Sequence, residues 1–164
     1  MFEVNDYIVY GLTGVCQITD IARDEISNND TQYYVLRPIS NDNLTIKVPV
    51  NNKNVTMRPI VTESGILSLI ANMLATETTW LDDDRQRNFK FKAALKSGKN
   101  EELIQVIRAL HVEREARALV GKKLSKTDED IMNAAEKQLN EEFAVALNIS
   151  PEEVMAFIFG HIPS

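Results

Sequence analysis

The stretch NVTMRPIVTESGILSLIANML, residues 54–74, contains the point at which the sequence pattern changes from strand to helix. Up to Pro59, apolar residues come in short runs that alternate with polar ones, which is the period of a β-strand. Beyond it they recur every three or four positions, as on one face of a helix. This change predicts a domain boundary near residues 59–62, with a β domain over residues 1–60 and a helical domain over residues 61–164.

Five short segments on the N-terminal side have the composition of β-strands. β-Branched and aromatic residues are frequent in them, and turn residues such as Gly11 and Gly14 separate the first from the second. The segments are residues 6–10, 15–21, 32–37, 44–49 and 54–58. The polar residues 23–30 predict a loop between the second and the third. Five short strands in so small a domain are typical of a strongly bent barrel.

The C-terminal side predicts about five helices, over residues 62–75, 82–96, 100–120, 125–146 and 151–159. The run Asp82-Asp83-Asp84 provides capping oxygens and negative charge where the second helix begins, and Ser97-Gly98 ends that helix. Ser150-Pro151-Glu152-Glu153 is a complete start signal for the last helix. The expected fold class is therefore α+β, a small N-terminal β-barrel followed by an all-helical C-terminal domain.

The net charge of −6 conceals an uneven distribution along the chain. Residues 85–123 carry 11 basic and 4 acidic side chains, whereas the segments before and after them are acidic. Phosphate binding draws its affinity from Lys and Arg, and a local patch sets the local potential even in an acidic protein. The basic segment therefore permits contact with nucleic acid that the net charge alone would argue against.

Within this segment, residues 85–99 contain six basic side chains and no acidic one. With about 100° per residue, four of the six share one side of a helix: Arg85, Lys92, Lys96 and Lys99. Phe91 and Leu95 can turn inward. Two interpretations stay open, a solvated face or a helix that contacts phosphates. In the second case Arg108, Arg114, Arg117, Lys122 and Lys123 could widen the patch if the third helix packs beside the second.

Trp80 is the sole tryptophan, and it stands on a polar connector between two predicted helices. One interpretation is that its ring packs between helices. The other is a wedge that pries at a base step in the minor groove while Lys and Arg hold the phosphates. No helix has the Arg, Asn and Gln pattern of a major-groove reader, so little reading of the base sequence is expected.

The sequence contains no convergent set of reactive groups. Cys16 is the only cysteine, which excludes an intramolecular disulfide and a cysteine metal cluster. His111 and His161 each lack a second His or Cys at metal-ligand spacing, and His111 is expected to make a surface contact with Glu115. Gly11 and Gly14 flank a hairpin turn and do not open a helix, so a phosphate loop is not expected. We therefore expect no enzyme, no metal and no cofactor.

The sequence has no run of about 18 apolar residues and no basic segment followed by an apolar one at its N-terminus. We expect a soluble, cytoplasmic protein that does not bind a membrane.

The order of several motifs resembles the CarD/CdnL family of RNA polymerase-binding transcription regulators over essentially the whole chain. The motifs are the start Phe2-Glu3-Val4-Asn5-Asp6-Tyr7-Ile8-Val9-Tyr10, the Gly14-Val15 hairpin, Tyr34-Val35-Leu36 and Leu44-Thr45-Ile46-Lys47-Val48-Pro49. The N-terminal part is also similar to the polymerase-interacting domain of transcription-repair coupling factors. The helical part, with Trp80 and Ser97-Gly98, favours the CarD-like interpretation.

The resemblance implies a Tudor-like or SH3-like barrel that binds the β subunit of RNA polymerase, partly by strand pairing. It implies that Lys47 lies at this interface, with Arg23 and Tyr34 as further contact residues. An exposed strand edge offers backbone donors and acceptors, which makes such docking physically sensible.

The resemblance further implies that the helical domain contacts promoter DNA at the upstream edge of the minus-ten region and stabilises the open complex. Trp80 matches the family's minor-groove wedge, and the other expected contact residues are Arg85, Arg87, Lys90 and Lys92. The run Asp82-Asp83-Asp84 departs from some members and puts acids close to this contact. A monomer is expected. The alternative is a protein adaptor on the polymerase that makes no direct DNA contact.

Overall fold

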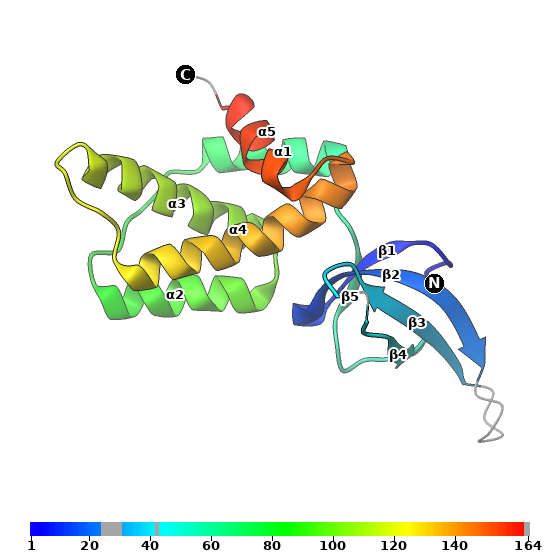
Figure 1. Cartoon of the computed structure of the whole chain (residues 1–164). Coiled ribbons are helices and arrows are strands. Elements are labelled where there is room, and N and C mark those ends of the chain that lie inside the picture. The colour runs from blue at the N-terminus through cyan, green and yellow to red at the C-terminus, as the bar shows by residue number, and fades with distance from the viewer. Residues whose placement is uncertain (24–30, 42, 163–164) are drawn as a thin grey trace. The chain divides into compact units, whose positions relative to one another are not determined.

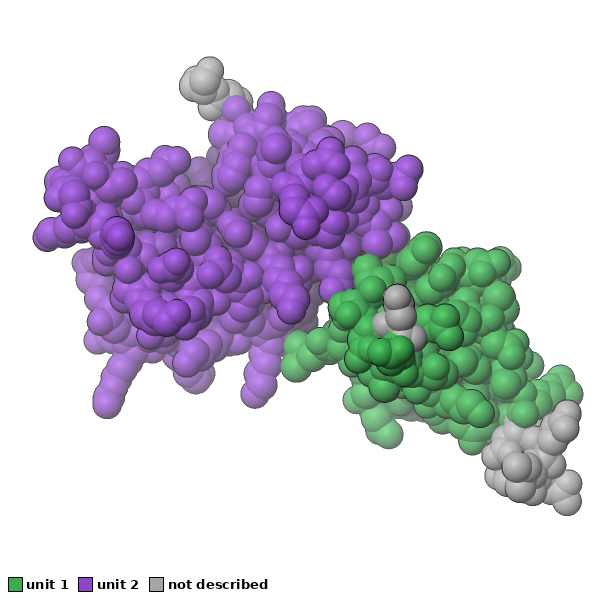
Figure 2. Space-filling model, viewed as in Figure 1, with its two compact units in different colours: residues 1–60 green, residues 61–164 purple. Residues whose placement is uncertain are grey.

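The structure is a computed structural model of the chain and describes residues 1–23, 31–41 and 43–162. Most of the loop expected over residues 23–30 lies outside these residues. The chain divides into two compact units, residues 1–60 and residues 61–164 (Figure 2). A five-stranded sheet forms the first unit and five α-helices form the second, so the expected α+β fold class is confirmed (Figure 1).

The first unit is an antiparallel sheet with the strand order β4-β3-β2-β1-β5. The strands are β1 (Tyr7–Tyr10), β2 (Gly14–Arg23), β3 (Gln32–Pro38), β4 (Ile46–Pro49) and β5 (Met57–Pro59). A single turn of 3₁₀ helix joins β1 to β2, and Gly11 there has a φ of +47°. A Cβ at Gly11 would lie 2.7 Å from the Val55 side chain, so this turn needs glycine for space as well as for conformation.

A bulge in β2 bends the sheet around a small core. The pairing of β2 with β3 shifts register between Ile18 and Asp20, and such a bulge increases local bending and twist. The buried side chains that this curvature gathers are Ile8, Cys16, Ile18, Tyr34, Leu36 and Val48. Period-two alternation in the sequence places these residues on the inner face.

The second unit contains α1 (Glu63–Ala75), α2 (Asp84–Ser97), α3 (Asn100–Ala118), α4 (Lys126–Leu147) and α5 (Val154–Gly160), with a 3₁₀ turn over Pro151–Glu153 before α5. Three of these helices begin at a side-chain cap: Thr62, Asp83 and Ser125 each accept a backbone N–H three residues on. Gly98 adopts the left-handed conformation that ends α2. The third helix ends two residues earlier than expected, and residues 119–121 form a turn.

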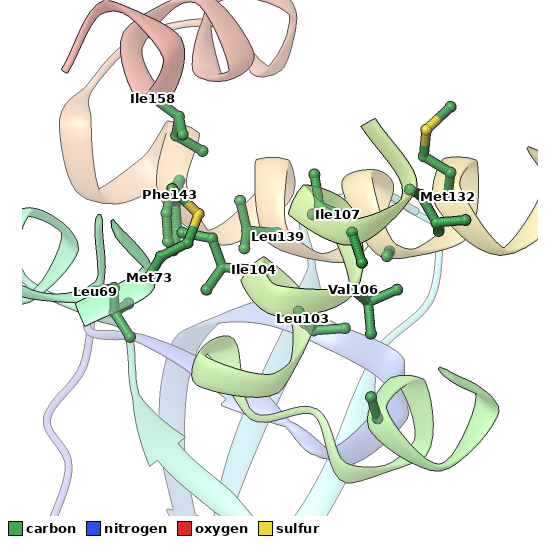
Figure 3. Close-up of a cluster of buried hydrophobic side chains, with 14 of the residues drawn as sticks. Leu69, Met73, Leu103, Ile104, Val106, Ile107, Met132, Leu139, Phe143 and Ile158 are labelled. Carbon is green, nitrogen blue, oxygen red and sulfur yellow. The ribbon is translucent and has the colours of Figure 1, made fainter. Parts of the chain in front are cut away.

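Helices α3 and α4 supply most of the apolar core of this unit (Figure 3). Leu139 and Phe143 of α4 are fully buried, and Leu110 of α3 is also without exposed surface. Helices α1, α2 and α5 pack their apolar faces against this pair. The residues between α1 and α2 cross the surface of this core, and they include Trp80.

No single helix among the described residues is long and apolar enough to cross a membrane. By length and composition, α4 together with Pro151–Gly160 passes the same test as a broken span, with a bend of 102° between the two parts. Much of the apolar surface of both lies in the core of the helical unit.

Candidate functional site

Trp80 lies on the irregular connector over residues 76–83, between α1 and α2. Its ring is half-buried and packs against the helical core. Phe91 of α2 contacts it edge-on, with ring centroids 6.1 Å apart and an interplanar angle of 60°. The ring is therefore held by the core, as the packing interpretation expects, and it keeps part of its surface open to solvent.

Arg87 of α2 covers one side of this ring. Its guanidinium carbon lies 4.5 Å from the centroid of the Trp80 ring, within the distance at which a cation is attracted to an indole face. The same guanidinium donates to both carboxylate oxygens of Asp128, at 3.2 and 2.8 Å. It also donates to Asp84 Oδ1 at 2.7 Å and to the Leu81 carbonyl at 2.9 Å.

The charge of Arg87 is compensated inside the protein. Asp128 is fully buried, and only 3% of Arg87 is exposed. Burial lowers the pKa of Arg87, but hydrogen bonds and charge from Asp128 and Asp84 outweigh this effect and raise the pKa above the ordinary arginine value. The guanidinium is thus a permanent cation in a bidentate buried pair.

The structure corrects the expectation that Arg87 contacts phosphates. Its hydrogen-bonding groups point to Asp128, Asp84 and Leu81, and almost none of its surface is accessible to a ligand. The aspartate run also has internal partners: Asp83 caps α2 and Asp84 pairs with Arg87. The proximity of Asp84 to Trp80 therefore reflects this ion pair.

The exposed face of α2 carries the remaining basic residues of the expected site. Arg85, Lys90 and Lys92 are all exposed, as are Lys96 and Lys99. Helical spacing puts Arg85 and Lys92 on one side with Phe89, which is 79% exposed. Lys90 lies apart from them, at a cavity between α1, α2 and α3 that Glu77, Glu101 and Glu102 also line.

The last turn of α3 brings a second arginine to Trp80, and the turn after it exposes apolar and basic side chains. The guanidinium carbon of Arg117 lies 6.0 Å from the Trp80 ring centroid, and Arg117 Nε donates to Glu113 at 3.0 Å. Leu119 and Val120 are 89% and 69% exposed, and Lys122 and Lys123 are exposed as well. No sequence-based expectation concerns Leu119 and Val120, because their apolar pattern continues the predicted helix.

The other arginines of α3 have different partners. Arg108 donates to the Met73 and Thr76 carbonyls, so it holds the end of α1. Arg114 contacts His111 Nδ1 at 2.9 Å, and His111 Nε2 lies 2.6 Å from Glu136 of α4. The expected partner of His111 was Glu115. The hydrogen bond found instead connects α3 to α4, and the His111 ring also packs against Phe159 of α5.

In the β unit, Lys47 is exposed on β4, which is an edge strand of the sheet. Lys47 pairs with Val35 in register, whereas Arg23 at the end of β2 pairs with Gln32. Side chains alternate between faces along β3, so these two basic residues belong to opposite faces of the sheet. The structure therefore does not bring Lys47 and Arg23 together on one surface.

Tyr34 is a core residue of the β unit, with 2% of its surface exposed. Its hydroxyl accepts a hydrogen bond from the Phe2 backbone N–H at 3.1 Å, and its ring contacts the Phe2 ring edge-on. This burial corrects the expectation that Tyr34 contacts a partner. Its side chain fixes the N-terminal segment of the chain to the sheet.

Comparison with known proteins gives matches over nearly the whole length. Residues 2–61 match the family model described as CarD-like/TRCF RID domain, and residues 69–159 match the model described as CarD, C-terminal domain. The chain is similar to the candidate transcription factor YdeB of Bacillus subtilis (strain 168). The two are 25% identical over 158 residues, covering 96% of this chain and 99% of YdeB.

Proposed function

The chain belongs to the CarD family of transcription regulators, whose N-terminal domain interacts with RNA polymerase, and on this premise we propose how it acts. Residues 1–60 bind the β subunit of the polymerase and hold the helical unit close to promoter DNA. The helical unit contacts the minor groove and phosphates at the upstream edge of the transcription bubble. This contact stabilises the open complex, and one copy of the chain is sufficient.

The surroundings of Trp80 carry this proposal. A half-buried aromatic ring is held by Phe91 and Arg87 and keeps an accessible part. Exposed cations lie on α2 and in the turn after α3: Arg85, Lys92, Lys96, Lys122 and Lys123. A flat ring beside side chains that can hold phosphates is the equipment of a minor-groove wedge. Exposed lysines and arginines of this kind are suited to phosphate contacts, which carry no sequence information, so the proposed DNA contact has low sequence specificity.

A wedge acts only if it prefers one state of the DNA. Trp80 would stack on unstacked bases at the edge of the bubble and find no equivalent surface on closed duplex, and such a differential shifts the equilibrium between the two. One stacked base contributes on the order of 1–3 kcal/mol. An effect of this size changes the ratio of open to closed complexes by roughly 5- to 150-fold.

The docking part of the proposal is supported by the edge strand β4. Lys47 lies on that strand and is exposed, and an edge strand has backbone groups with which a second chain can pair. Docking makes the DNA contact intramolecular, so a contact too weak for the acidic free chain becomes effective at high local concentration.

The DNA contact is tested by the lifetime of open complexes formed by reconstituted polymerase with this protein. Trp80→Ala should remove most of the stabilisation, because the stacking surface is lost. Phe159→Ala is a matched control, since Phe159 is a partly exposed aromatic residue on α5. An unchanged lifetime with Trp80→Ala would show the wedge to be wrong.

Docking is tested separately by co-purification with the polymerase β subunit. Lys47→Glu should greatly reduce co-purification, whereas Lys53→Glu, an exposed lysine outside the strands, should leave it intact. Equal retention of both variants would move the interface away from β4.

A protein adaptor without DNA contact is the second candidate, and the exposed apolar side chains Phe89, Leu119 and Val120 are the observation that favours it. Crosslinking within the polymerase–promoter complex separates the two. A crosslink from position 80 to DNA that weakens steeply with salt supports the DNA contact. The absence of any crosslink to DNA supports the adaptor.

A further inference from the structure

The backbone around Trp80 has no regular structure to orient it. The connector over residues 76–83 contains neither helix nor strand, so side-chain contacts must set the direction of the ring. Besides its packing on the helical core, the ring contacts Phe91 edge-on, and the guanidinium carbons of Arg87 and Arg117 lie 4.5 and 6.0 Å from its centroid. Of the two arginines, Arg87 lies closer to the ring centroid and is the more buried.

Arg87 contacts both the ring of Trp80 and the backbone beside it. While its guanidinium lies against the ring, its Nη1 donates to the carbonyl of Leu81, the next residue in the chain, at 2.9 Å. One rigid, planar group therefore restrains the side chain and the adjoining peptide at once.

The guanidinium is itself fixed from the opposite side. Nε and Nη2 donate to the two carboxylate oxygens of Asp128, whose N–H is bound by the Ser125 cap of α4. Asp84, one helical turn before Arg87, adds a hydrogen bond from the solvent side. A bidentate pair leaves a planar fork little rotational freedom, so the orientation of α4 is transmitted to the indole.

We propose that Arg87 is a positioning residue for the DNA contact, and that the Asp128–Arg87 pair holds Trp80 in the orientation that the wedge requires. This inference rests on the proposed function. It reassigns Arg87 from a phosphate contact to the support of the residue that makes contact. A lysine would keep the charge, but it could not bind Asp128 bidentately while reaching both Leu81 and the ring.

The sole tryptophan makes the orientation measurable without any partner. In the free protein, Arg87→Lys should lower the fluorescence anisotropy of Trp80 and increase its quenching by acrylamide. In the polymerase assay the same variant should lose the open-complex stabilisation several-fold. Lys137→Arg, an exposed position on α4 with no part in the proposed DNA contact, should change neither measurement.

Two further variants separate positioning from general destabilisation. Ile158→Val loosens the core at α5, and it should leave the Trp80 anisotropy unchanged even where it lowers the unfolding temperature. If Arg87→Lys does not fold, Asp84→Asn removes only the charge of the exposed partner and should shift the anisotropy in the same direction by a smaller amount. Circular dichroism establishes which variants are folded.

Each outcome decides the proposal. Wild-type anisotropy and quenching in Arg87→Lys would overturn the proposal; where Arg87→Lys does not fold, the same result in Asp84→Asn would do so. A variant in which the Trp80 ring is loosened but the open-complex lifetime is fully retained would also overturn it. If Trp80→Ala leaves the lifetime unchanged, the proposed function fails and takes this proposal with it. A loss with Trp80→Ala but none with Arg87→Lys would leave the wedge in place and reject only its support by Arg87.

Discussion

Glu142 is a buried carboxylate that binds two separate parts of the helical unit. It lies on α4 with 3% of its surface exposed, and it accepts from the Val61 backbone N–H at 2.7 Å and from Asn100 Nδ2 at 3.1 Å. Val61 is the first residue after the β unit, so Glu142 fixes the start of the helical unit.

Removing this acceptor should destabilise the helical unit. In Glu142→Ala the Val61 N–H and Asn100 Nδ2 lose their carboxylate acceptor, and we expect a loss of about 2–4 kcal/mol in the free energy of unfolding. Glu142→Gln keeps one acceptor oxygen and should lose less, and Lys137→Ala, exposed on the same helix, should lose almost nothing. Urea unfolding monitored by circular dichroism measures all three. A loss below about 0.5 kcal/mol for Glu142→Ala would contradict this role.

The exposed cations of α2 predict a second effect at the scale of single residues. Arg85→Ala and Lys92→Ala should each weaken DNA crosslinking within the polymerase–promoter complex and reduce its salt dependence by about one charge. Arg85 and Lys92 are exposed on the face that carries Phe89. Lys53→Ala in the β unit is the control. A salt dependence identical to that of wild type would exclude α2 from the phosphate contact.

At the scale of single elements, the start of α5 shows how a local signal becomes structure. Glu153 accepts from the Ser150 side-chain hydroxyl at 2.8 Å and from its backbone N–H at 3.2 Å. These two hydrogen bonds lower the pKa of Glu153 below its ordinary value, and the bond from the Ser150 hydroxyl has the larger effect. The stabilisation is therefore present above the ordinary carboxyl pKa and is lost as the pH falls through the lowered value.

The lowered pKa of Glu153 predicts that a variant unable to titrate at this position differs from wild type in its pH dependence only at acid pH. Glu153→Gln retains a capping-box geometry but does not titrate, so its unfolding temperature should fall less than that of wild type between neutral pH and pH 3. Thermal unfolding at constant ionic strength measures the difference. Glu152→Gln, an exposed neighbour, should follow the wild-type curve. Parallel acid curves for Glu153→Gln and wild type would contradict the prediction.

Local signals explain why so much of the fold could be predicted from the sequence. The caps at Thr62, Asp83 and Ser125 and the left-handed Gly98 depend on neighbours within three residues, and all lie where expected. Leu119 and Val120 were assigned to a helix because their apolar pattern continues it. The chain turns after α3, where Gly121 has a left-handed conformation. The presence of a glycine at position 121 did not reveal that the helix ends at Ala118.

The site was harder to predict because its decisive contacts are distant in sequence. Arg87 meets Asp128 across 41 positions. Helical spacing puts Arg87 on the side of Phe91 and away from Arg85, but no pattern within α2 gives the partner of its charge. The family motif predicts Tyr34 at a partner surface, whereas its place on β3 puts it on the inner face with Leu36. Charge composition located the basic helix correctly, but only packing determines which cation is buried.

At the scale of the whole molecule, the proposal depends on a tether between two separate units. A flexible ten-residue Gly/Ser insertion between Pro59 and Ile60 should preserve co-purification with polymerase. It should lower open-complex stabilisation several-fold, because effective concentration falls with linker length. The same insertion after Ile162, beyond α5, is the control. An unchanged open-complex lifetime would argue that the DNA contact does not depend on the tether.

The Asp128–Arg87 pair also has a consequence for biosynthesis. The ribosome makes Trp80 and Arg87 well before Asp128, which lies 41 positions after Arg87 and anchors it. All residues of the β unit precede Trp80, so that unit can fold first during synthesis, as N-terminal domains generally do. A nascent chain that stops short of α4 would therefore carry a complete β unit and the indole, but not the carboxylate that orients it.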